Sequence, residues 1–361
     1  MAMAMAMAKE ASQPRTGDTT RRGRWGAGLI ACVVLSCLLA ACGGSASSSN
    51  SITLYNGQHE QTTDALVARF EKLTGIKVNV RSDDEDVFAS QITAEGSHSP
   101  ADVLFTENSP PLEYLQQKGL LAPVAPSTLA HTPSRYNSPT GHWVGVSARV
   151  SVLVYNTRLL TPAQLPTSVM QLADPEWKGK LAIAPGETDF QPIVTSVART
   201  YGNAAALRWL EALKANAGSA HSYPDNETIV DQVNRGQVAL GVINQYYWYR
   251  ERAQVGASNV HSAIVHFAPR DPGYVIDVSG AAALKSSPHQ VDAQKLLAFL
   301  VSAEGQQIIA HTDSFEYPIA SGVITDQPET PLDKLRPNPI GIPALGDGAT
   351  AIALLQKAQL L

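Results

Sequence analysis

Apolar residues recur along the first third of the chain in two alternating periods, one typical of strands and one typical of helices. Residues 52–55 form a short apolar run that predicts a buried strand. Residues 62–74 place Leu66, Val67, Phe70 and Leu73 on one helical face. We expect Thr62 or Thr63 to cap that helix and Gly75 to end it. The pattern then predicts a strand at 76–80, a helix at 88–96, a strand at 101–108 and a helix at 110–119.

Two long extended segments dominate the rest of the pattern. Residues 143–157 are mostly apolar and long enough to leave one lobe and enter another, and 274–285 can return. Between them the pattern predicts a strand, loop and helix start at 181–190, a helix at 203–216, and a helix then a strand at 229–243. Residues 291–312 read as helical, and the Pro-rich stretch 326–343 reads as a surface connection.

These elements predict an α/β fold with two lobes, each an open sheet flanked by helices, joined by crossing strands. We expect an N-terminal lobe of residues 51–150 plus 277–327 and a C-terminal lobe of residues 151–276 plus 328–361. In open sheets of this kind, ligands lie beyond the carboxyl ends of the strands.

The N-terminus carries the features of an export signal. Arg21, Arg22 and Arg24 precede the apolar run AGLIACVVLSCLLAAC, which is shorter than the roughly 20 apolar residues of a comfortable membrane span. The ending LAAC resembles a bacterial lipobox, which predicts that residues 1–41 are removed, that Cys42 is lipidated, and that 42–50 form a flexible tether. Alternatively, 26–42 stay as an uncleaved membrane anchor. Both hypotheses place the rest of the chain outside the cytoplasm, held at the cell membrane.

Cysteine usage and charge narrow the classes of function. The three cysteines, Cys32, Cys37 and Cys42, all lie at or before the lipobox, so the body of the chain has no thiol for a disulfide, a nucleophile or a thiolate metal site. Removing residues 1–41 takes away five basic and two acidic side chains, which leaves 22 basic against 30 acidic ones. This negative balance argues against nucleic acid as a partner.

The run NQYYWYRER, residues 244–252, is unusual in a chain that is only 6% aromatic. In a strand, Tyr246 and Tyr247 would point to opposite faces, and in a helix they would diverge by about 100°. If both hydroxyls serve one purpose, the chain must bend here, where a strand ends and a helix begins. The alternative is that one ring packs in the core and the other lies on the surface.

Several motifs together resemble the ferric-iron-binding proteins of bacterial ABC importers. These motifs occur in the same order as in that family, over about residues 52–320, and they are LYNGQHE, ADVLFTEN, DPEWKGKLAI, INQYYWY, RDPG with VSGAAALK, AEGQQ and EYP. NGQHE and NQYYW are the specific ones. The resemblance implies a type II periplasmic-binding fold that closes on Fe(III), an ABC-type iron permease with its ATPase as partners, and a monomer.

The resemblance also implies which residues bind the metal. His59 matches the imidazole ligand, Glu107 the carboxylate ligand, and Tyr246 and Tyr247 the paired phenolates. The residues that correspond to the binding region of an exogenous anion are Asn226, Asn244, Gly186, Glu187 and Thr188. Backbone N–H groups at a helix start can hold an anion, but the carboxylates of Glu187 and the following Asp189 oppose phosphate.

The chemistry of these residue types agrees with iron. Fe(III) is a hard ion that favours anionic oxygen donors. Ionising one tyrosine at pH 7 costs about 4 kcal/mol, since the reference pKa is about 10, so two phenolates suit only a strong Lewis acid. Three anionic ligands balance the charge, His59 adds a fourth donor, and two octahedral positions remain for an exogenous anion or water.

Other interpretations stay open. Taken alone, His59 fits a structural histidine, Glu107 a helix cap, and Asn226 and Asn244 turn residues. The same fold could bind an organic anion such as a phosphonate, or a cationic solute against aromatic faces. A metal-dependent phosphoesterase is a third hypothesis, although the chain has no HExxH, no G-x-S-x-G and no dense His/Asp set.

Overall fold

A computed structural model describes residues 50–323 and 330–361, which lie in one compact unit, Ser48–Leu361. The signal segment 1–41, the lipidation site Cys42 and all of the tether except Asn50 lie outside the described residues. The lobe boundary expected between 327 and 328 lies outside them as well.

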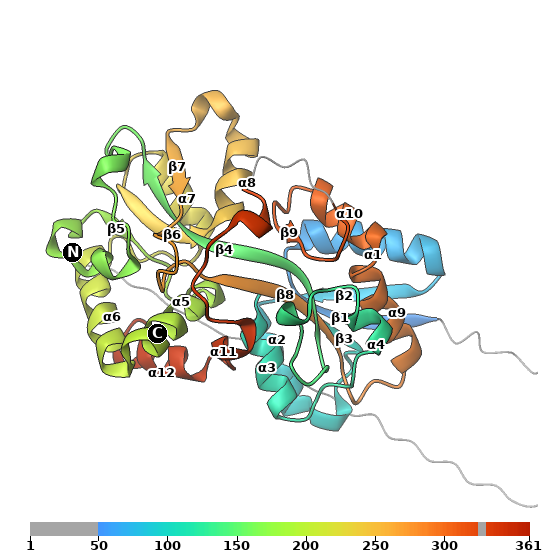
Figure 1. Cartoon of the computed structure of the whole chain (residues 1–361). Coiled ribbons are helices and arrows are strands. Elements are labelled where there is room, and N and C mark those ends of the chain that lie inside the picture. Colours follow the sequence, from blue (N-terminus) through green and yellow to red (C-terminus); the bar gives the residue numbers. More distant parts are fainter. Residues whose placement is uncertain (1–49, 324–329) are drawn as a thin grey trace, which may run out of the picture. The chain divides into compact units, whose positions relative to one another are not determined.

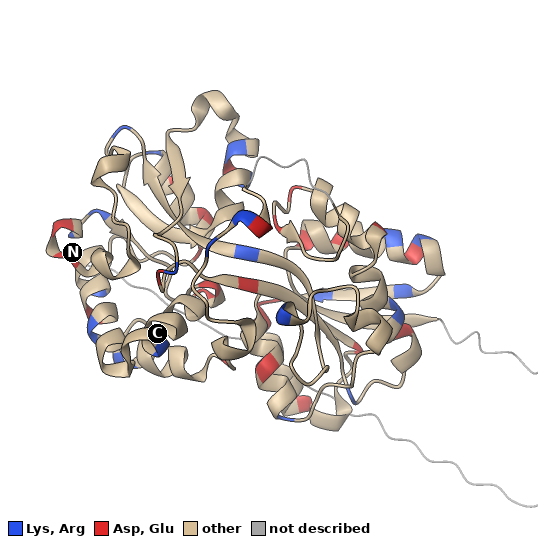
Figure 2. Ribbon diagram, in the orientation of Figure 1, with Lys and Arg blue, Asp and Glu red and all other residues tan. Residues whose placement is uncertain are grey.

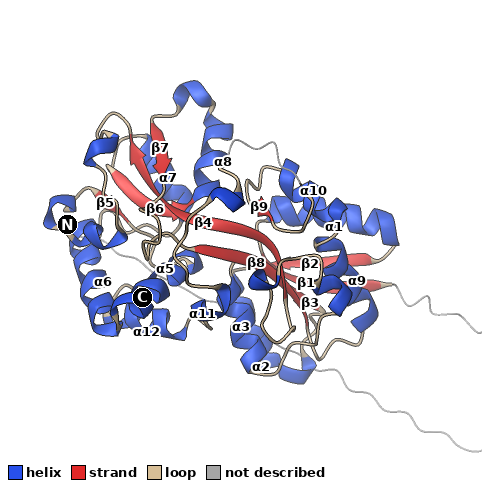
Figure 3. Cartoon of the chain, viewed as in Figure 1, coloured by secondary structure: helices blue, strands red, loops and turns tan. Residues whose placement is uncertain are grey.

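Strands and helices alternate along the described chain, with the strands inside and the helices around them (Figure 3). The strands are β1 (Ser51–Gly57), β2 (Lys77–Ser82), β3 (Val103–Thr106), β4 (Val144–Asn156), β5 (Leu181–Ala182), β6 (Leu240–Asn244), β7 (Ser262–Val265), β8 (Ile276–Ala283) and β9 (Tyr317–Pro318). The first helices are α1 (Glu60–Thr74), α2 (Glu85–Glu95), α3 (Ser109–Gln117), α4 (Pro126–Leu129), α5 (Gln191–Tyr201) and α6 (Asn203–Ala217). The later ones are α7 (Asn226–Asn234), α8 (Gln245–Val255), α9 (Gln290–Leu300), α10 (Ala303–His311), α11 (Ile342–Leu345) and α12 (Ala349–Lys357).

The strands follow the order β2-β1-β3-β8-β4-β6-β5, with β7 and β9 pairing with β4 (Figure 1). β1 pairs in parallel with β2 and β3, and β5 pairs in parallel with β6, while β4 and β8 run antiparallel to their neighbours. β4 pairs with β8 as far as Val150 and with β6 from Ser151 onward. This change of partner lies between residues 150 and 151, where the lobe boundary is proposed.

Burial explains why the long strands were readable from the sequence. Every residue of β4 is buried, and strands covered on both faces carry nearly continuous apolar runs. One apolar cluster lies between β1, β3, α1 and α9, where the rings of Phe70 and Phe299 are 5.7 Å apart. Most acidic and basic residues lie on helices and loops, with few on the strands (Figure 2). Within the described residues, no helix has the length and apolar character needed to span a bilayer.

Three details differ from the expectation. The N-cap of α1 is His59, not Thr62 or Thr63, because the buried Thr63 hydroxyl donates to Asn56 Oδ1 at 2.7 Å and so ties the helix to the end of β1. Residues 291–312 form two helices, since Ser302 caps a new one by accepting from the Gly305 N–H at 3.1 Å. The pattern also missed α12, which packs on α5 and α6.

Candidate metal centre

A cavity of about 710 Å³ opens beyond the ends of β1 and β3. Its walls come from two parts of the chain: residues 56–61, 82–87 and 107 on one side, and 186–188, 224, 225, 227, 247 and 250 on the other. Nine carboxylate side chains line it, and Arg250 is the one Lys or Arg among the described lining residues. A cavity with this charge balance concentrates cations rather than anions. Its acidic lining residues are Glu60, Asp83, Asp84, Glu85, Asp86, Glu107, Glu187, Asp225 and Glu227.

His59 and Glu107 meet on the wall that precedes β4. His59 follows β1 and caps α1, and Glu107 directly follows β3, which pairs in parallel with β1. His59 Nε2 lies 3.0 Å from Glu107 Oε1. Arg250 Nη1 lies 3.2 Å from the same nitrogen.

Tyr246 and Tyr247 approach this pair from the other side. They occupy the first turn of α8, immediately after β6, so the chain bends at the strand-to-helix junction that the sequence indicated. Their rings lie side by side, with centroids 4.1 Å apart and planes 34° from parallel. The His59 ring is 5.1 Å from the Tyr246 ring and 5.9 Å from the Tyr247 ring. The alternative of one packed and one surface ring does not hold, because both rings are buried and adjacent.

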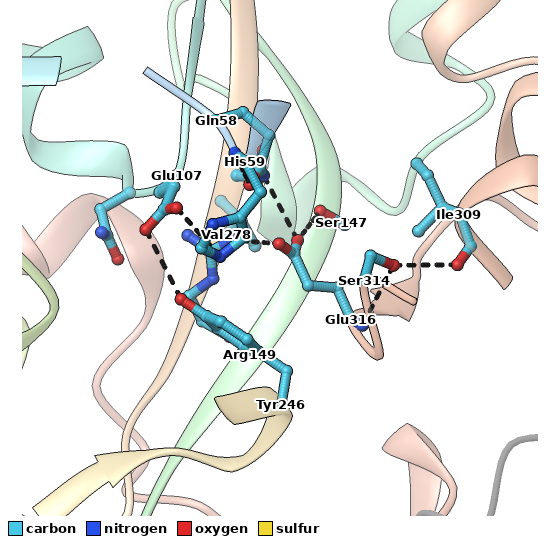
Figure 4. Close-up of polar contacts among 12 residues, drawn as sticks. Gln58, His59, Glu107, Ser147, Arg149, Tyr246, Val278, Ile309, Ser314 and Glu316 are labelled. Carbon is cyan, nitrogen blue, oxygen red and sulfur yellow. Dashed lines mark hydrogen bonds and ion pairs between the residues drawn. The ribbon is translucent and has the colours of Figure 1, made fainter. Parts of the chain in front are cut away.

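The Tyr246 hydroxyl lies between two carboxylates. It is 3.5 Å from Glu107 Oε2 and 3.3 Å from Asp189 Oδ2. Figure 4 shows the Glu107 carboxylate between the His59 ring and the Tyr246 hydroxyl. Glu107 and Tyr246, which we expected on opposite sides of the cleft, are therefore in contact in this structure.

Of the residues expected near an anion, Asn226 is hydrogen-bonded to Asp189. Asn226, the first residue of α7, donates from Nδ2 to Asp189 Oδ2 at 3.1 Å and to Glu187 Oε2 at 3.4 Å. Gly186, Glu187 and Thr188 line the main cavity. Asn244, the buried N-cap of α8, borders a small neighbouring void together with Asp189. The sequence had marked Asp189 only as a charge that opposes phosphate.

A buried ion pair lies behind the tyrosines. The Arg149 guanidinium, on β4, is fully buried, lies 2.8 Å from Glu316 Oε1 and is 5.4 Å from the centre of the Tyr246 ring (Figure 4). Gln58 Nε2 donates to Glu316 Oε2 at 3.4 Å, and the Ser147 hydroxyl also donates to that oxygen. Arg149 is therefore salt-bridged in the interior and not solvated.

Burial decides the protonation of the four central groups. Desolvation, reinforced by the charges of Arg250 and Arg149, lowers the pKa of His59 well below its usual value, so the imidazole is neutral. Desolvation and then the charge of Asp189 raise the pKa of Glu107 and those of both tyrosines well above their usual values. Without a bound cation, the phenols therefore keep their protons.

Two neighbouring carboxyl groups, those of Glu85 and Glu187, also have raised pKa values. Burial, followed by the charge of Asp86, raises the pKa of Glu85 to about 8. Burial, followed by the charge of Asp189, raises the pKa of Glu187 to about 9. Glu85 and Glu187 hold protons at neutral pH chiefly because burial disfavours their charged forms, and the negative charges beside them add to this effect. A cation entering the site would offset those charges.

In the described part of the chain, no three His, Cys, Asp or Glu side chains are spaced to hold a metal ion by themselves. Tyr246 and Tyr247, whose rings lie 5.1 and 5.9 Å from the His59 ring, offer two further oxygen donors beside His59 and Glu107. Donors of this kind, two phenols with one imidazole and one carboxylate, suit a hard, highly charged ion.

Comparisons with known proteins agree with this chemistry. Residues 98–338 match the family profile described as bacterial extracellular solute-binding protein. The chain is 38% identical over 308 residues to the Fe(3+)-binding periplasmic protein of Serratia marcescens, covering 85% of this chain and 90% of that protein. It is 37% identical over 310 residues to the major ferric iron-binding protein of Neisseria meningitidis serogroup A, covering 85% and 92%.

Solved structures of iron-bound proteins are also similar to this chain. Iron-bound HitA from Pseudomonas aeruginosa superposes with a TM-score of 0.80 at 38% identity, over 85% of this chain and 99% of that one. The Trichodesmium protein IdiA (FutA), in complex with iron and citrate, superposes with a TM-score of 0.73 at 29% identity, over 85% and 99%. The predicted two-lobed periplasmic-binding fold is confirmed by these neighbours.

Proposed function

Because this chain belongs to the bacterial extracellular solute-binding protein family, we propose that it is the extracytoplasmic iron(III)-binding component of an ABC importer. It captures Fe(III) in the cavity beyond β1 and β3 and delivers it to a membrane permease driven by its ATPase. The relatives that support this role are named as ferric iron-binding proteins.

The observation that carries the proposal is the convergence of His59, Glu107, Tyr246 and Tyr247. All four follow strands that end at the cavity, and their side chains lie next to one another. They supply one neutral nitrogen and three oxygens that become anionic when iron displaces their protons. Two octahedral positions are left for an exogenous anion or water.

Iron binding couples to closure because the ligands lie on different parts of the chain. His59 and Glu107 belong to the lobe proposed for residues 51–150 plus 277–327, and the tyrosines to the lobe proposed for 151–276 plus 328–361. An ion that needs both sets stabilises only the arrangement in which they meet.

The charge of the cavity argues against an organic anion as the cargo. A phosphonate would enter a space lined by nine carboxylates and a single Arg among the described lining residues. The phosphoesterase hypothesis finds no support either, since the relatives are named as binding proteins and not as enzymes. We assign no catalytic residue.

The proposed place of action is outside the cytoplasm. The relative from Serratia marcescens is named a periplasmic protein, and the export signal at residues 1–41 leads to the same compartment. We propose that lipidated Cys42 holds the protein at the membrane as a monomer, with the tether leaving the cavity free to face the permease.

Titrating the purified apo-protein with ferric citrate tests the function. We expect one iron per chain, a visible phenolate-to-iron charge-transfer band that saturates at this ratio, and a smaller radius of gyration in solution scattering. Zinc and magnesium should give no such band at equal concentration. A protein that stays colourless and iron-free would overturn the assignment.

A further inference from the structure

A hydrogen bond joins α2 and α5, two helices that belong to different proposed lobes and carry no proposed iron ligand. Gln191 is the first residue of α5, and its Nε2 atom donates to Oδ2 of Asp86, the second residue of α2, at 3.0 Å. The Gln191 side chain is buried, and Asp86 lines the cavity. Because α2 precedes β4 and α5 follows it, a motion that separates the two proposed lobes breaks this bond.

We propose that Gln191 is a positioning residue for iron capture, which holds the two sets of metal ligands together by binding Asp86 across the cavity. The bond forms between groups that do not bind the ion, so it acts in the empty and in the loaded protein alike. This inference rests on the proposed function and specifies what slows the release of iron.

The acceptor of this bond is a half-buried carboxylate. Burial raises the pKa of Asp86, and the hydrogen bond from Gln191 acts in the opposite direction because it stabilises the ionised form. Hydrogen bonds to ionised groups are stronger than those between neutral groups. The bond therefore favours the arrangement in which α2 and α5 meet, and opening leaves the carboxylate without this donor.

The Gln191 amide is packed on its other side by the turn before α12. A Cβ atom placed on Gly348 would lie 2.6 Å from Gln191 Oε1 and 3.4 Å from Pro110 Cβ, so the chain passes close to both side chains. Gly348 has a φ of 77°, a conformation that glycine adopts without strain. With its oxygen against this turn and its nitrogen toward Asp86, the amide is oriented before the bond forms, which limits the entropy lost on closure.

The segment that leads into α5 makes two more bonds across the same boundary. Asn108 Nδ2 donates to Thr188 Oγ1 at 3.1 Å and to Asp189 Oδ1 at 3.0 Å. Asn108 directly follows the proposed ligand Glu107, so its substitution would disturb the metal centre as well. Gln191 is therefore the position at which a contact across the boundary can be removed while the proposed ligands stay unchanged.

Three single variants test this role. Gln191→Met removes the donor and keeps the length of the side chain, and Asp86→Ala removes the acceptor together with one charge of the cavity wall. Asp84→Ala is the matched control, because Asp84 lines the same cavity but makes no hydrogen bond to α5 in the described structure. An effect of lost charge should appear in both aspartate variants, and an effect of the lost bond only in Asp86→Ala and Gln191→Met.

The measured quantity is the rate at which loaded protein gives up iron to an excess of chelator, followed by decay of the visible band. A hydrogen bond to a charged group is worth about 10- to 100-fold in an equilibrium constant. Since Asp86 is half-buried, we expect release about tenfold faster from Gln191→Met and Asp86→Ala, and within about twofold of wild type from Asp84→Ala. The band itself should not shift, because the ligands are the same. In solution scattering, apo Gln191→Met should have a larger radius of gyration than the apo wild type.

Exchanging donor and acceptor gives a test that does not depend on how one variant folds. Gln191→Glu alone places two carboxylates together and should release iron faster than wild type, although an added negative charge by itself would hold a cation more tightly. Combining it with Asp86→Asn restores a hydrogen bond of reversed direction and should return the release rate to within about threefold of wild type.

A Gln191→Met protein with the release rate and apo radius of the wild type would overturn the inference. So would a shifted visible band in that variant, or a double variant that releases iron as fast as Gln191→Glu alone. A wild type that binds no iron would instead overturn the proposed function, and the radii of the apo-proteins would still decide whether Gln191 holds the two proposed lobes together.

Discussion

Tyr247→Phe separates coordination by a phenolate from simple packing. The Tyr247 ring is 96% buried against Tyr246, whereas its hydroxyl makes no hydrogen bond with the described residues. The substitution therefore removes one oxygen and leaves no buried partner unpaired. We expect the unfolding free energy of the apo-protein to change by less than about 0.5 kcal/mol.

The pKa shifts set the size of the effect on iron. Burial, and then the charge of Asp189, raises the pKa of both phenols well above 10, so each is protonated at neutral pH in the apo-protein. Ionising each one at pH 7 costs at least about 4 kcal/mol, which iron must offset. Every proton displaced by the metal makes the affinity rise tenfold per pH unit. The two phenols together give about 100-fold per pH unit, and one phenol gives about tenfold.

The sign of the pH dependence follows from these shifts. Groups with raised pKa hold protons in the apo-protein, and iron binds only their deprotonated forms. Iron affinity should therefore fall as the pH is lowered, and acid should release iron from the wild type reversibly. The raised pKa of Glu107 adds a further proton to the exchange at a pH below that pKa.

Two measurements on the same samples decide the matter. Competition with citrate at several pH values gives the affinity, and absorbance per bound iron gives the number of phenolates. For Tyr247→Phe we expect an affinity at least about 100-fold lower at pH 7 and a visible band roughly halved per iron. Absorbance is the deciding readout, because a hydroxide that replaces the phenolate restores the proton count but not the colour. A variant that is fully loaded and fully coloured would refute the assignment of Tyr247 as a ligand.

Three further predictions concern the ion pair, the anchor and the core. Arg149→Met leaves the buried Glu316 unpaired and should lower the unfolding free energy by about 3–5 kcal/mol in thermal or urea melts; a variant as stable as the wild type would contradict the pairing. Cys42→Ala should move the protein from the membrane fraction to the soluble fraction with iron binding unchanged, whereas continued membrane retention would favour 26–42 as the anchor. Gly241→Ala places a methyl group 2.5 Å from Ile229 Cγ2 and should cost about 1–3 kcal/mol in melts without altering the iron band; an unchanged melting curve would show that the core yields there.

The elements of the fold that could be predicted are those whose burial gives a recognisable local pattern of apolar residues. β4 and β8 read as long apolar runs because they are covered on both faces. The bend before Tyr246 was predictable because two adjacent tyrosines can serve one site only where a strand passes into a helix. By contrast, the break between α9 and α10 depends on the Ser302 cap, and Gly305 there lies where a Cβ would be 2.3 Å from the Phe299 carbonyl oxygen. That contact exists only in the folded chain.

The candidate site also contains residues that the sequence predicted and residues that it did not. Its four central residues were found through motifs that resemble a known family, whereas composition and periodicity alone left each with an ordinary structural role. Asp189 was read as an obstacle to anions because its partners are distant in sequence. Asn108 and Tyr246 lie 81 and 57 positions away from it, and no local pattern reports such contacts. The same holds for Arg149, whose partner Glu316 lies in the loop directly before β9.

The position of the metal ligands relative to β4 explains how one ion can control closure. His59 and Glu107 precede this strand, the tyrosines follow it, and the strand changes partners between Val150 and Ser151. A change of twist at that point would separate the two proposed ligand sets. Coordination then contributes its free energy only to the closed arrangement, while the buried carboxylates and protonated phenols oppose closure when iron is absent. Under the proposed function, the bound ion would hold the two proposed lobes together, and protonation of the proposed ligands would release it.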